Sequence, residues 1–186
     1  MTHIVSAESA TAILTALDAR DAEVWVGGGW EVDALLGEQT RQHSDLDMWL
    51  DAQTIEPLFV TLADLGVDRV FPWPGDRPWN FVLHDGGHLR INLHCFESAP
   101  DDTLHYGAFS ENQTFPRTAL SGRGMIAGMT VRCERPDWAV RWRCGYAHDR
   151  STATMFHGCV LGSPSPSPRH SANRSACGDL IDPWTG

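Results

Sequence analysis

The apolar and polar positions in the first 150 residues follow two periods, one typical of helices and one typical of strands. Apolar residues three and four positions apart predict amphipathic helices over residues 6–18, 30–36, 54–65 and 136–146. Short apolar runs and strict alternation predict strands over residues 23–26, 45–49, 68–71, 79–84, 88–96 and 125–133, the last of them a hairpin broken at Gly128. The pattern therefore predicts an α/β fold, a small mixed sheet flanked by helices.

Residues at the ends of these segments support the boundaries. Ser6 and Thr54 are suitable N-caps, and Gly37 and Gly66 are suitable helix ends. The segment 85–87, Asp-Gly-Gly, predicts a tight turn between two strands, and the segment 72–75 predicts another turn. Residues 97–123 are polar and contain glycines, so we expect mostly loop there, a candidate flap facing the substrate.

The character of the chain changes after residue 150. Ser-Pro repeats, isolated glycines and the loss of apolar periodicity predict a disordered tail. We therefore expect one folded domain over residues 1–150 and a tail over residues 151–186.

Composition excludes several classes of function. The net charge of −10 argues against an extended nucleic-acid partner and favours small or cationic ones. All 14 basic residues are arginine, which excludes a phosphate loop of the Gly-Lys-Ser/Thr type. No apolar run approaches the roughly 20 residues that span a membrane, and the first residues lack a signal-peptide pattern, so we expect a cytoplasmic protein. The sequence does not fix the oligomeric state.

The segment 25–49 carries the most specific chemistry. Three glycines, 27–29, follow a short apolar strand and precede a helix, an arrangement in which backbone N–H groups can approach a phosphate. Asp45 and Asp47 share one face of the next strand, where two carboxylates repel each other unless a cation lies between them. Each half alone is more often an ordinary turn or a solvated strand face. Together, in this order, they suggest Mg²⁺-assisted nucleotide chemistry.

With these residues in view, the chain resembles the DNA-polymerase-β-like nucleotidyltransferase superfamily. The segments 25–37 and 40–47 look like those of the small antibiotic nucleotidyltransferases, which include aminoglycoside 2″-adenylyltransferases and lincosamide nucleotidyltransferases. Residues 126–133 resemble the aminoglycoside branch, whereas residues 91–94 and 144–146 look more like the lincosamide branch. The resemblance covers roughly residues 8–150.

The resemblance implies transfer of a nucleoside monophosphate, AMP from ATP or its counterpart from another nucleoside triphosphate, to a hydroxyl of a small acceptor, an aminoglycoside or a lincosamide antibiotic. Asp45 and Asp47 would hold Mg²⁺, and Gly28 and Gly29 would approach the phosphates. Arg41, just before the aspartates, is a candidate phosphate contact; a solvated loop arginine is the alternative.

The third acidic position of the family pattern matches Asn92 in this sequence. An amide cannot accept a proton at neutral pH and offers one neutral oxygen in place of a charged one. His94 and Glu97 are the candidates for the base and for contacts with the acceptor. A zinc site built from His88, His94, Cys95 and His105 is an alternative that lacks tight ligand spacing.

In the family that the chain resembles, an acidic segment and a further helix follow the last predicted one, and the sequence after residue 150 departs from that pattern. One permitted choice of codons for residues 151–162, read from the third base of the Ser151 codon, encodes a segment like that helix. We therefore hypothesise a frameshift near residue 150, and the codons of the gene test it.

Two other functions stay open at this point. Asn92 and the unusual tail are also compatible with a catalytically impaired relic of the fold. A transferase that acts on a protein partner is the third possibility.

Overall fold

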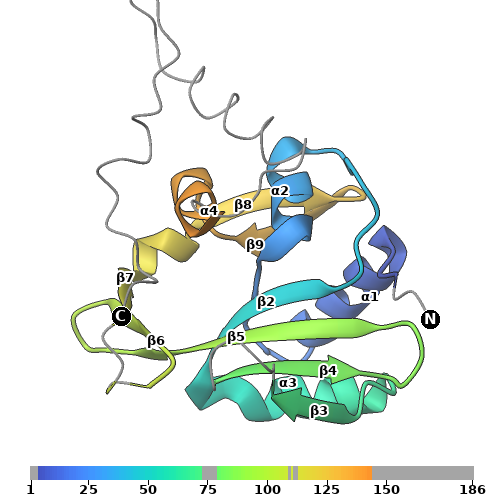
Figure 1. The fold of residues 1–186 in the computed structure, drawn as a ribbon, viewed down its shortest axis with the longest axis horizontal. Helices are drawn as coiled ribbons and strands as arrows, with labels where there is room; N and C mark the ends of the chain where they lie inside the picture. Colours follow the sequence, from blue (N-terminus) through green and yellow to red (C-terminus); the bar gives the residue numbers. More distant parts are fainter. Residues whose placement is uncertain (1–3, 73–78, 109, 111–112, 144–186) are drawn as a thin grey trace, which may run out of the picture.

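A computed structural model describes residues 4–72, 79–108, 110 and 113–143 (Figure 1). The helices are α1 (Ala7–Asp18), α2 (Gly28–Leu36), α3 (Ile55–Asp64) and α4 (Pro136–Arg143), with short 3-10 helices η1 (Ala52–Thr54) and η2 (Arg117–Leu120). The strands are β1 (Trp25–Val26), β2 (Leu46–Asp51), β3 (Arg69–Pro72), β4 (Asn80–His84), β5 (Arg90–Ser98), β6 (Thr103–Tyr106), β7 (Thr114–Pro116), β8 (Gly122–Ile126) and β9 (Met129–Cys133).

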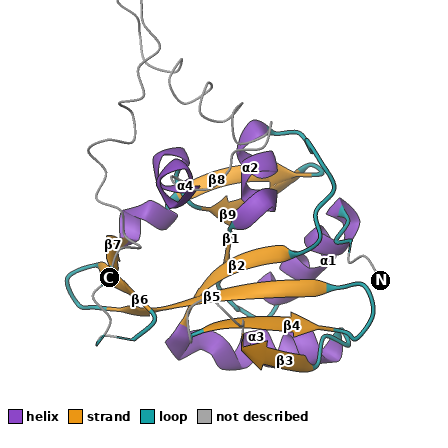
Figure 2. Cartoon of the chain, viewed as in Figure 1, coloured by secondary structure: helices purple, strands orange, loops and turns teal. Residues whose placement is uncertain are grey.

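The strands of the described chain form one mixed sheet, ordered β3-β4-β5-β2-β1-β9-β8 (Figure 2). The pairs β2–β5 and β1–β9 are parallel, and the other pairs are antiparallel. Strands β6 and β7 extend the far end of β5 outside this order. The prediction of an α/β fold with a small mixed sheet is confirmed.

The parallel pairing of β2 with β5 decides which side chains share a face. In this register Asp47 lies opposite Asn92, and Trp49 lies opposite His94. Successive residues of a strand point to opposite faces, so these four side chains project from one side of the sheet. The strand that carries Asn92 and His94 therefore lies directly beside the aspartate strand.

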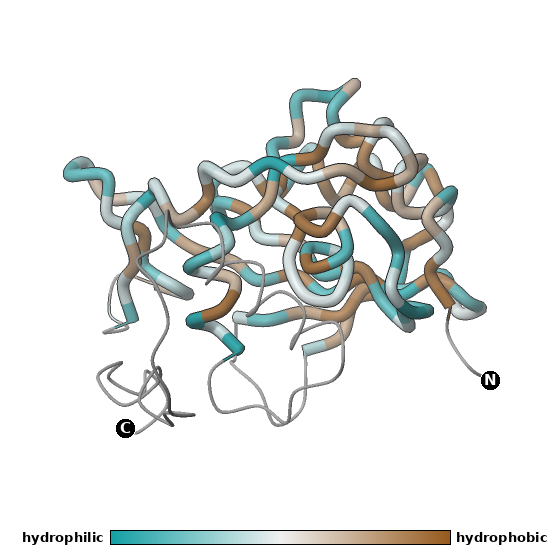
Figure 3. Tube along the Cα trace, turned by 90° about the horizontal axis from the view of Figure 1, so that it is seen from above, coloured by the Kyte–Doolittle hydropathy of each residue, from teal (hydrophilic) through white to brown (hydrophobic). Residues whose placement is uncertain are grey.

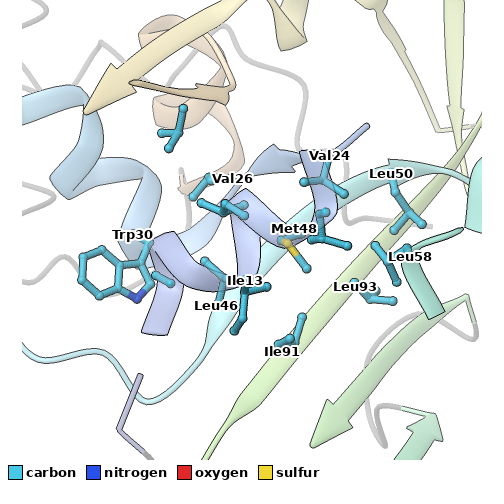
Figure 4. Close-up of a cluster of buried hydrophobic side chains, with 14 of the residues drawn as sticks. Ile13, Val24, Val26, Trp30, Leu46, Met48, Leu50, Leu58, Ile91 and Leu93 are labelled. Carbon is cyan, nitrogen blue, oxygen red and sulfur yellow. The ribbon is translucent and has the colours of Figure 1, made fainter. Parts of the chain in front are cut away.

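The opposite face of β2 and β5 carries the main core. Leu46, Met48, Ile91 and Leu93 are fully buried there and pack with apolar residues of α1 and α3 (Figure 4). The trace coloured by hydropathy shows short apolar stretches alternating with polar turns, as this arrangement requires (Figure 3). The predicted helical stripe of α1 is confirmed, because Ala10, Ile13, Leu14 and Leu17 are its buried residues.

Among the helix ends that the structure describes, the predictions are correct except at the starts of α2 and α3. Ser6 caps α1 by accepting a hydrogen bond from the Ser9 N–H, and Gly37 ends α2 in a left-handed conformation. However, α2 begins at Gly28 and not at residue 30. Thr54 does not cap α3 with its side chain; its Oγ1 donates to the Asp51 carbonyl across the intervening turn η1.

The expectation that residues 97–123 are mostly loop is wrong. Strand β5 continues to Ser98, and β6, β7, η2 and the start of β8 follow it. Strands of three or four residues are too short to show a period of two in the sequence, and their pairing with β5 is set by tertiary contacts. Leu104, Tyr106 and Phe115 are buried because these strands cover a second, aromatic cluster.

Some predictions fall outside the described residues. These are most of the turn at 72–75, the end of the last helix with Tyr146, and the tail over residues 151–186 with its hypothesised frameshift. None of the described helices has the length and apolarity needed to cross a membrane.

Candidate active site

The glycine turn lies directly against the second aspartate. Gly28 has a φ of +61°, and a Cβ built on it would lie 1.8 Å from Asp47 Oδ2. Only glycine allows this approach, because every other residue would place an atom inside the carboxylate. Helix α2 begins at Gly28, so the N–H groups of its first turn lie close to the carboxylate. The sequence prediction that the turn and the acidic residues form one site is consistent with this contact.

Asp45, Asp47 and Asn92 meet on the open face of the sheet. Asn92 Nδ2 donates to Asp47 Oδ1 at 3.1 Å, and the Asn92 side chain also hydrogen-bonds Asp45. Burial raises the pKa of Asp45, and the negative charge of Asp47 raises it further. Burial also opposes ionisation of Asp47, but hydrogen bonds from His94 and Asn92 outweigh it and lower its pKa. The site therefore holds a stable carboxylate beside a second carboxyl group that resists ionisation.

The imidazole of His94 is held between two partners. Its Nε2 lies 3.3 Å from Asp47 Oδ1, and its Nδ1 lies 2.8 Å from the Tyr106 hydroxyl. The same hydroxyl donates to Asn80 Oδ1 at 3.0 Å, and Asn80 is fully buried. His94 is thus oriented toward the acidic residues by a chain of hydrogen bonds that begins in the core.

Arg41 stands at the other end of the glycine turn. Its Nη2 atom would be 2.6 Å from a Cβ on Gly29, so the guanidinium lies beside the backbone of the turn. The loop that carries it is anchored by Asp33, which accepts a hydrogen bond from Thr40 Oγ1 at 2.5 Å and lies 2.5 Å from His43 Nε2. Both Asp33 and His43 are buried, so the loop before β2 has a fixed path.

Glu97 is not with the other candidate residues. It follows Phe96 on β5, and by strand alternation it belongs to the face opposite Asn92 and His94. Its register partner is His105 on β6. Of the two side chains considered as alternatives to a third carboxylate, His94 alone shares the face of Asp47.

Sequence analysis missed a buried charged group behind the turn, formed by Glu31, Glu134 and Arg143. Glu31 is 0% exposed, and its Oε2 lies 3.0 Å from Arg143 Nη2. Glu134 Oε1 accepts a hydrogen bond from Trp49 Nε1 at 2.5 Å. Burial raises the pKa of Glu31 to about 7, against the opposing effect of Arg143. A glutamate between Trp30 and Val32 on a short apolar helix was the available signal, because a charge there requires a buried partner.

The other described groups give no second site of this kind. Among the described residues, no three His, Cys, Asp or Glu side chains gather as a metal site would need, so the zinc alternative has no support there. The aromatic residues of α4 pack against the second hydrophobic cluster. The ring centroids of Trp138 and Trp142 lie 6.0 Å apart, and both rings contact the cluster that contains Trp49 and Phe115.

Sequence comparison finds similar proteins over most of the length of the chain. A sequence model described as aminoglycoside-2″-adenylyltransferase matches residues 9–153. A 2″-aminoglycoside nucleotidyltransferase of Escherichia coli is 33% identical over 138 residues, which cover 74% of this chain and 71% of that protein. A lincosamide resistance protein of Staphylococcus haemolyticus is 35% identical over 80 residues, 43% of this chain and 49% of that protein.

Solved structures agree on the fold. The lincomycin-bound lincosamide antibiotic adenylyltransferase LnuA aligns with a TM-score of 0.68 at 19% identity, covering 85% of this chain and 98% of that one. ANT(2″)-Ia in complex with adenylyl-2″-tobramycin aligns with a TM-score of 0.65 at 23% identity, covering 84% and 89%. The fold is therefore that of the antibiotic nucleotidyltransferases, as the sequence resemblance implied. Within this class, the chain belongs to the aminoglycoside-2″-adenylyltransferase family of enzymes.

Proposed function

We propose that this enzyme transfers AMP from ATP, with Mg²⁺, to a hydroxyl of an aminoglycoside, and that a lincosamide is the second candidate acceptor. The aminoglycoside comes first because the family match and the 2″-aminoglycoside relative extend over most of the chain. The lincosamide is kept because a shorter stretch is similar to a lincosamide resistance protein.

One observation carries the proposal: the glycine turn and the acidic residues form a single site. A Cβ on Gly28 would lie within the Asp47 carboxylate, and Asp45 hydrogen-bonds the same asparagine as Asp47. A helix N-terminus binds anions, and a pair of carboxylates binds a divalent cation. A nucleoside triphosphate with its metal ion presents both charges to such a site.

The side chains at this site fit Mg²⁺. The group offers carboxylate and amide oxygens, and the charge of Asp47 hinders ionisation of Asp45, which is the repulsion that a cation between them would relieve. Asp45 and Asp47 would hold the ion, and when bound it would neutralise charge on the triphosphate.

The protein's own groups have separate tasks in this proposal. The N–H groups at the start of α2, with Arg41 beside Gly29, bind and orient the phosphates. Asn92 cannot accept the acceptor's proton, because its Oδ1 accepts from Arg90 Nε at 3.2 Å and an amide is not basic. Asn92 instead stabilises the ionised Asp47 through its N–H group.

Mass spectrometry tests the proposal. The protein is incubated with Mg²⁺, ATP or GTP, and a panel of aminoglycosides and lincosamides, and each acceptor is examined for an added nucleoside monophosphate. We expect adenylylation of an aminoglycoside and its loss in Asp45→Asn. Transfer that persists in Asp45→Asn would contradict the assigned site.

Asn92 favours a second candidate, a catalytically impaired relic. If wild type modifies no acceptor and Asn92→Asp restores transfer, the relic is correct. The third candidate, a transferase for a protein partner, predicts label on protein and none on any antibiotic, which the same experiment detects when a cell extract is included.

A further inference from the structure

The C-terminal end of α4 reaches the glycine turn through one side chain, Arg143. Its guanidinium donates to the Gly28 carbonyl, a contact between residues 115 positions apart in the chain. Nη2 also lies 3.0 Å from Glu31 Oε2, and Nη1 donates to the Ala139 carbonyl of its own helix at 2.6 Å. One planar group therefore links α4, the side chain of Glu31 and the backbone of the turn.

Arg143 is held in place by buried acidic groups. Glu31 is fully buried, and its Oε1 accepts a hydrogen bond from the backbone N–H of Glu134 at 3.1 Å. Glu134 in turn accepts from Trp49 on the strand that carries Asp47. Burying an unpaired charge is strongly unfavourable, so the guanidinium of Arg143 depends on its contact with Glu31. The guanidinium therefore has one fixed position behind the turn.

The contact at the Gly28 carbonyl has a geometric consequence for the next amide. No cis peptide occurs among the described residues, and in a trans peptide the C=O of one residue and the N–H of the next point in opposite directions. When Arg143 holds the Gly28 carbonyl, it also sets the direction of the Gly29 N–H. This N–H belongs to the first turn of α2, where the first amide bonded within the helix is that of Glu31, to the Gly27 carbonyl.

The Asp47 carboxylate restrains the same residue at its Cα. Asp47 Oδ2 occupies the space where a Gly28 side chain would be, while the guanidinium holds the carbonyl of the peptide between Gly28 and Gly29. A rotation of this peptide would turn the Gly29 N–H away from its present direction. The N–H groups of a first helical turn bind phosphate only when they converge on it.

We propose that Arg143 is a positioning residue for the nucleotide: it acts through the Gly28 carbonyl to aim the Gly29 N–H at a phosphate. This assignment rests on the proposed function for its ligand, but the orientation of the turn can be tested without any nucleotide. Arg143 does not contact the substrate in this scheme.

The experiment compares three variants of the whole chain. Arg143→Gln removes the charge, and Arg143→Lys keeps the charge but not the planar fork that reaches Gly28 and Glu31 together. Arg141→Gln is the matched control, because Arg141 lies on the same helix with its guanidinium 4.5 Å from the Trp138 ring and outside the turn. Amide hydrogen exchange of residues 28–31 is measured by NMR without nucleotide, and affinity for a non-hydrolysable ATP analogue with Mg²⁺ is measured by calorimetry.

We expect faster exchange at Glu31, whose amide makes the first hydrogen bond of the turn, and about tenfold weaker nucleotide binding in Arg143→Gln, the size expected for one lost charge-assisted hydrogen bond. Arg143→Lys should fall between Arg143→Gln and wild type, and Arg141→Gln should match wild type in both measurements. A change in acceptor binding is not expected.

The outcomes separate the two proposals. If Arg143→Lys remains folded and matches wild type in exchange and in affinity, the positioning role is overturned. If Arg143→Gln does not fold, the comparison of Arg143→Lys with wild type tests the positioning role. If wild type binds no nucleotide, the proposed function fails, and the exchange rates alone then support or overturn the role of Arg143 in the turn.

Discussion

Gly28 and Asp47 occupy adjoining space so closely that a Cβ on the glycine would lie 1.8 Å from the carboxylate oxygen. The two residues come from the start of α2 and from β2, and their contact joins the predicted phosphate-binding turn to the predicted metal ligands. Each part of the site therefore constrains the other, and substitutions at either residue should affect both.

Gly28→Ala should abolish most of the transfer activity. The new methyl group must displace Asp47 or the turn, and a displacement of about 1 Å at a reacting centre costs on the order of 100-fold in rate. The positive φ adds strain of about 1–2 kcal/mol. Gly37→Ala is the matched control: its φ is +76°, but a Cβ there meets nothing within 4 Å. It should lose stability and keep its specific activity. Equal activity losses in the two variants would argue against the Gly28–Asp47 contact.

Asn92→Asp should make the protein depend on a divalent cation for stability. A third carboxylate beside Asp45 and Asp47 removes a hydrogen-bond donor and adds like-charge repulsion. Without Mg²⁺ we expect a lower melting temperature than wild type, and with Mg²⁺ a larger rise than wild type shows. Asn92→Ala, which removes the donor but adds no charge, serves as the control. If Mg²⁺ does not change the melting temperature of Asn92→Asp, the result would contradict a cation at this site.

The buried carboxyl of Glu31 should make stability fall with rising pH. Its pKa is raised from 4.5 to about 7 by burial, so between these values the folded protein holds a proton that the unfolded chain has lost. The contribution is fully present below pH 4.5 and is lost as the pH rises through 7. At most it amounts to about 3 kcal/mol.

Urea denaturation of wild type and Glu31→Gln between pH 5 and about 8 measures this contribution. The glutamine stays neutral, so wild type should lose stability relative to the variant as the pH rises, while effects of groups that do not interact with Glu31 cancel in the difference. Glu8 lies on the exposed side of α1, so the free energy of unfolding of Glu8→Gln should change with pH as that of wild type does. A difference between wild type and Glu31→Gln that does not change with pH would contradict the raised pKa.

Asp33→Asn should loosen the loop that carries Arg41. Asp33 is buried, and its carboxylate contacts both Thr40 and His43. The substitution leaves a buried hydrogen bond unmade and should therefore lower the free energy of unfolding by about 1–3 kcal/mol. Nucleotide affinity should weaken as well, because the loop positions Arg41 beside Gly29. Thr40→Ala removes one of the two contacts and should show a smaller effect in the same titrations. Unchanged stability in Asp33→Asn would show that the loop is held by other contacts.

Local sequence predicts the elements that carry their own signals. The alternation around Asp45–Asp47 and around Asn92–His94 identifies both strands and the residues that share a face within each, and the glycines predict the turn between β1 and α2. The family resemblance is carried in large part by these same residues. The parts of the site that depend on one strand at a time therefore follow from the amino-acid sequence alone.

The contacts made across long distances in the chain do not follow from local sequence. Arg143 lies 112 positions from Glu31, and nothing in either neighbourhood indicates the other residue. Strands β6 and β7 are too short for a visible period, and Glu97 lies three positions from His94 in the chain although the pleat turns it to the other face. Tertiary packing decides the Arg143–Glu31 contact and the short strands, whereas the face of Glu97 follows from strand alternation once β5 is known to continue to Ser98.

The parallel register of β2 and β5 also has a consequence for how the enzyme folds. Asp47 meets Asn92 only after a loop of 45 residues closes, and non-local parallel pairing of this kind is slow compared with helix or hairpin formation. A slip of one residue would turn Asp47 into the apolar core and Met48 out of it, which is energetically prohibitive. We therefore expect the acidic face to form after the local helices and hairpins, so that the site is assembled only in chains that have completed this long-range pairing.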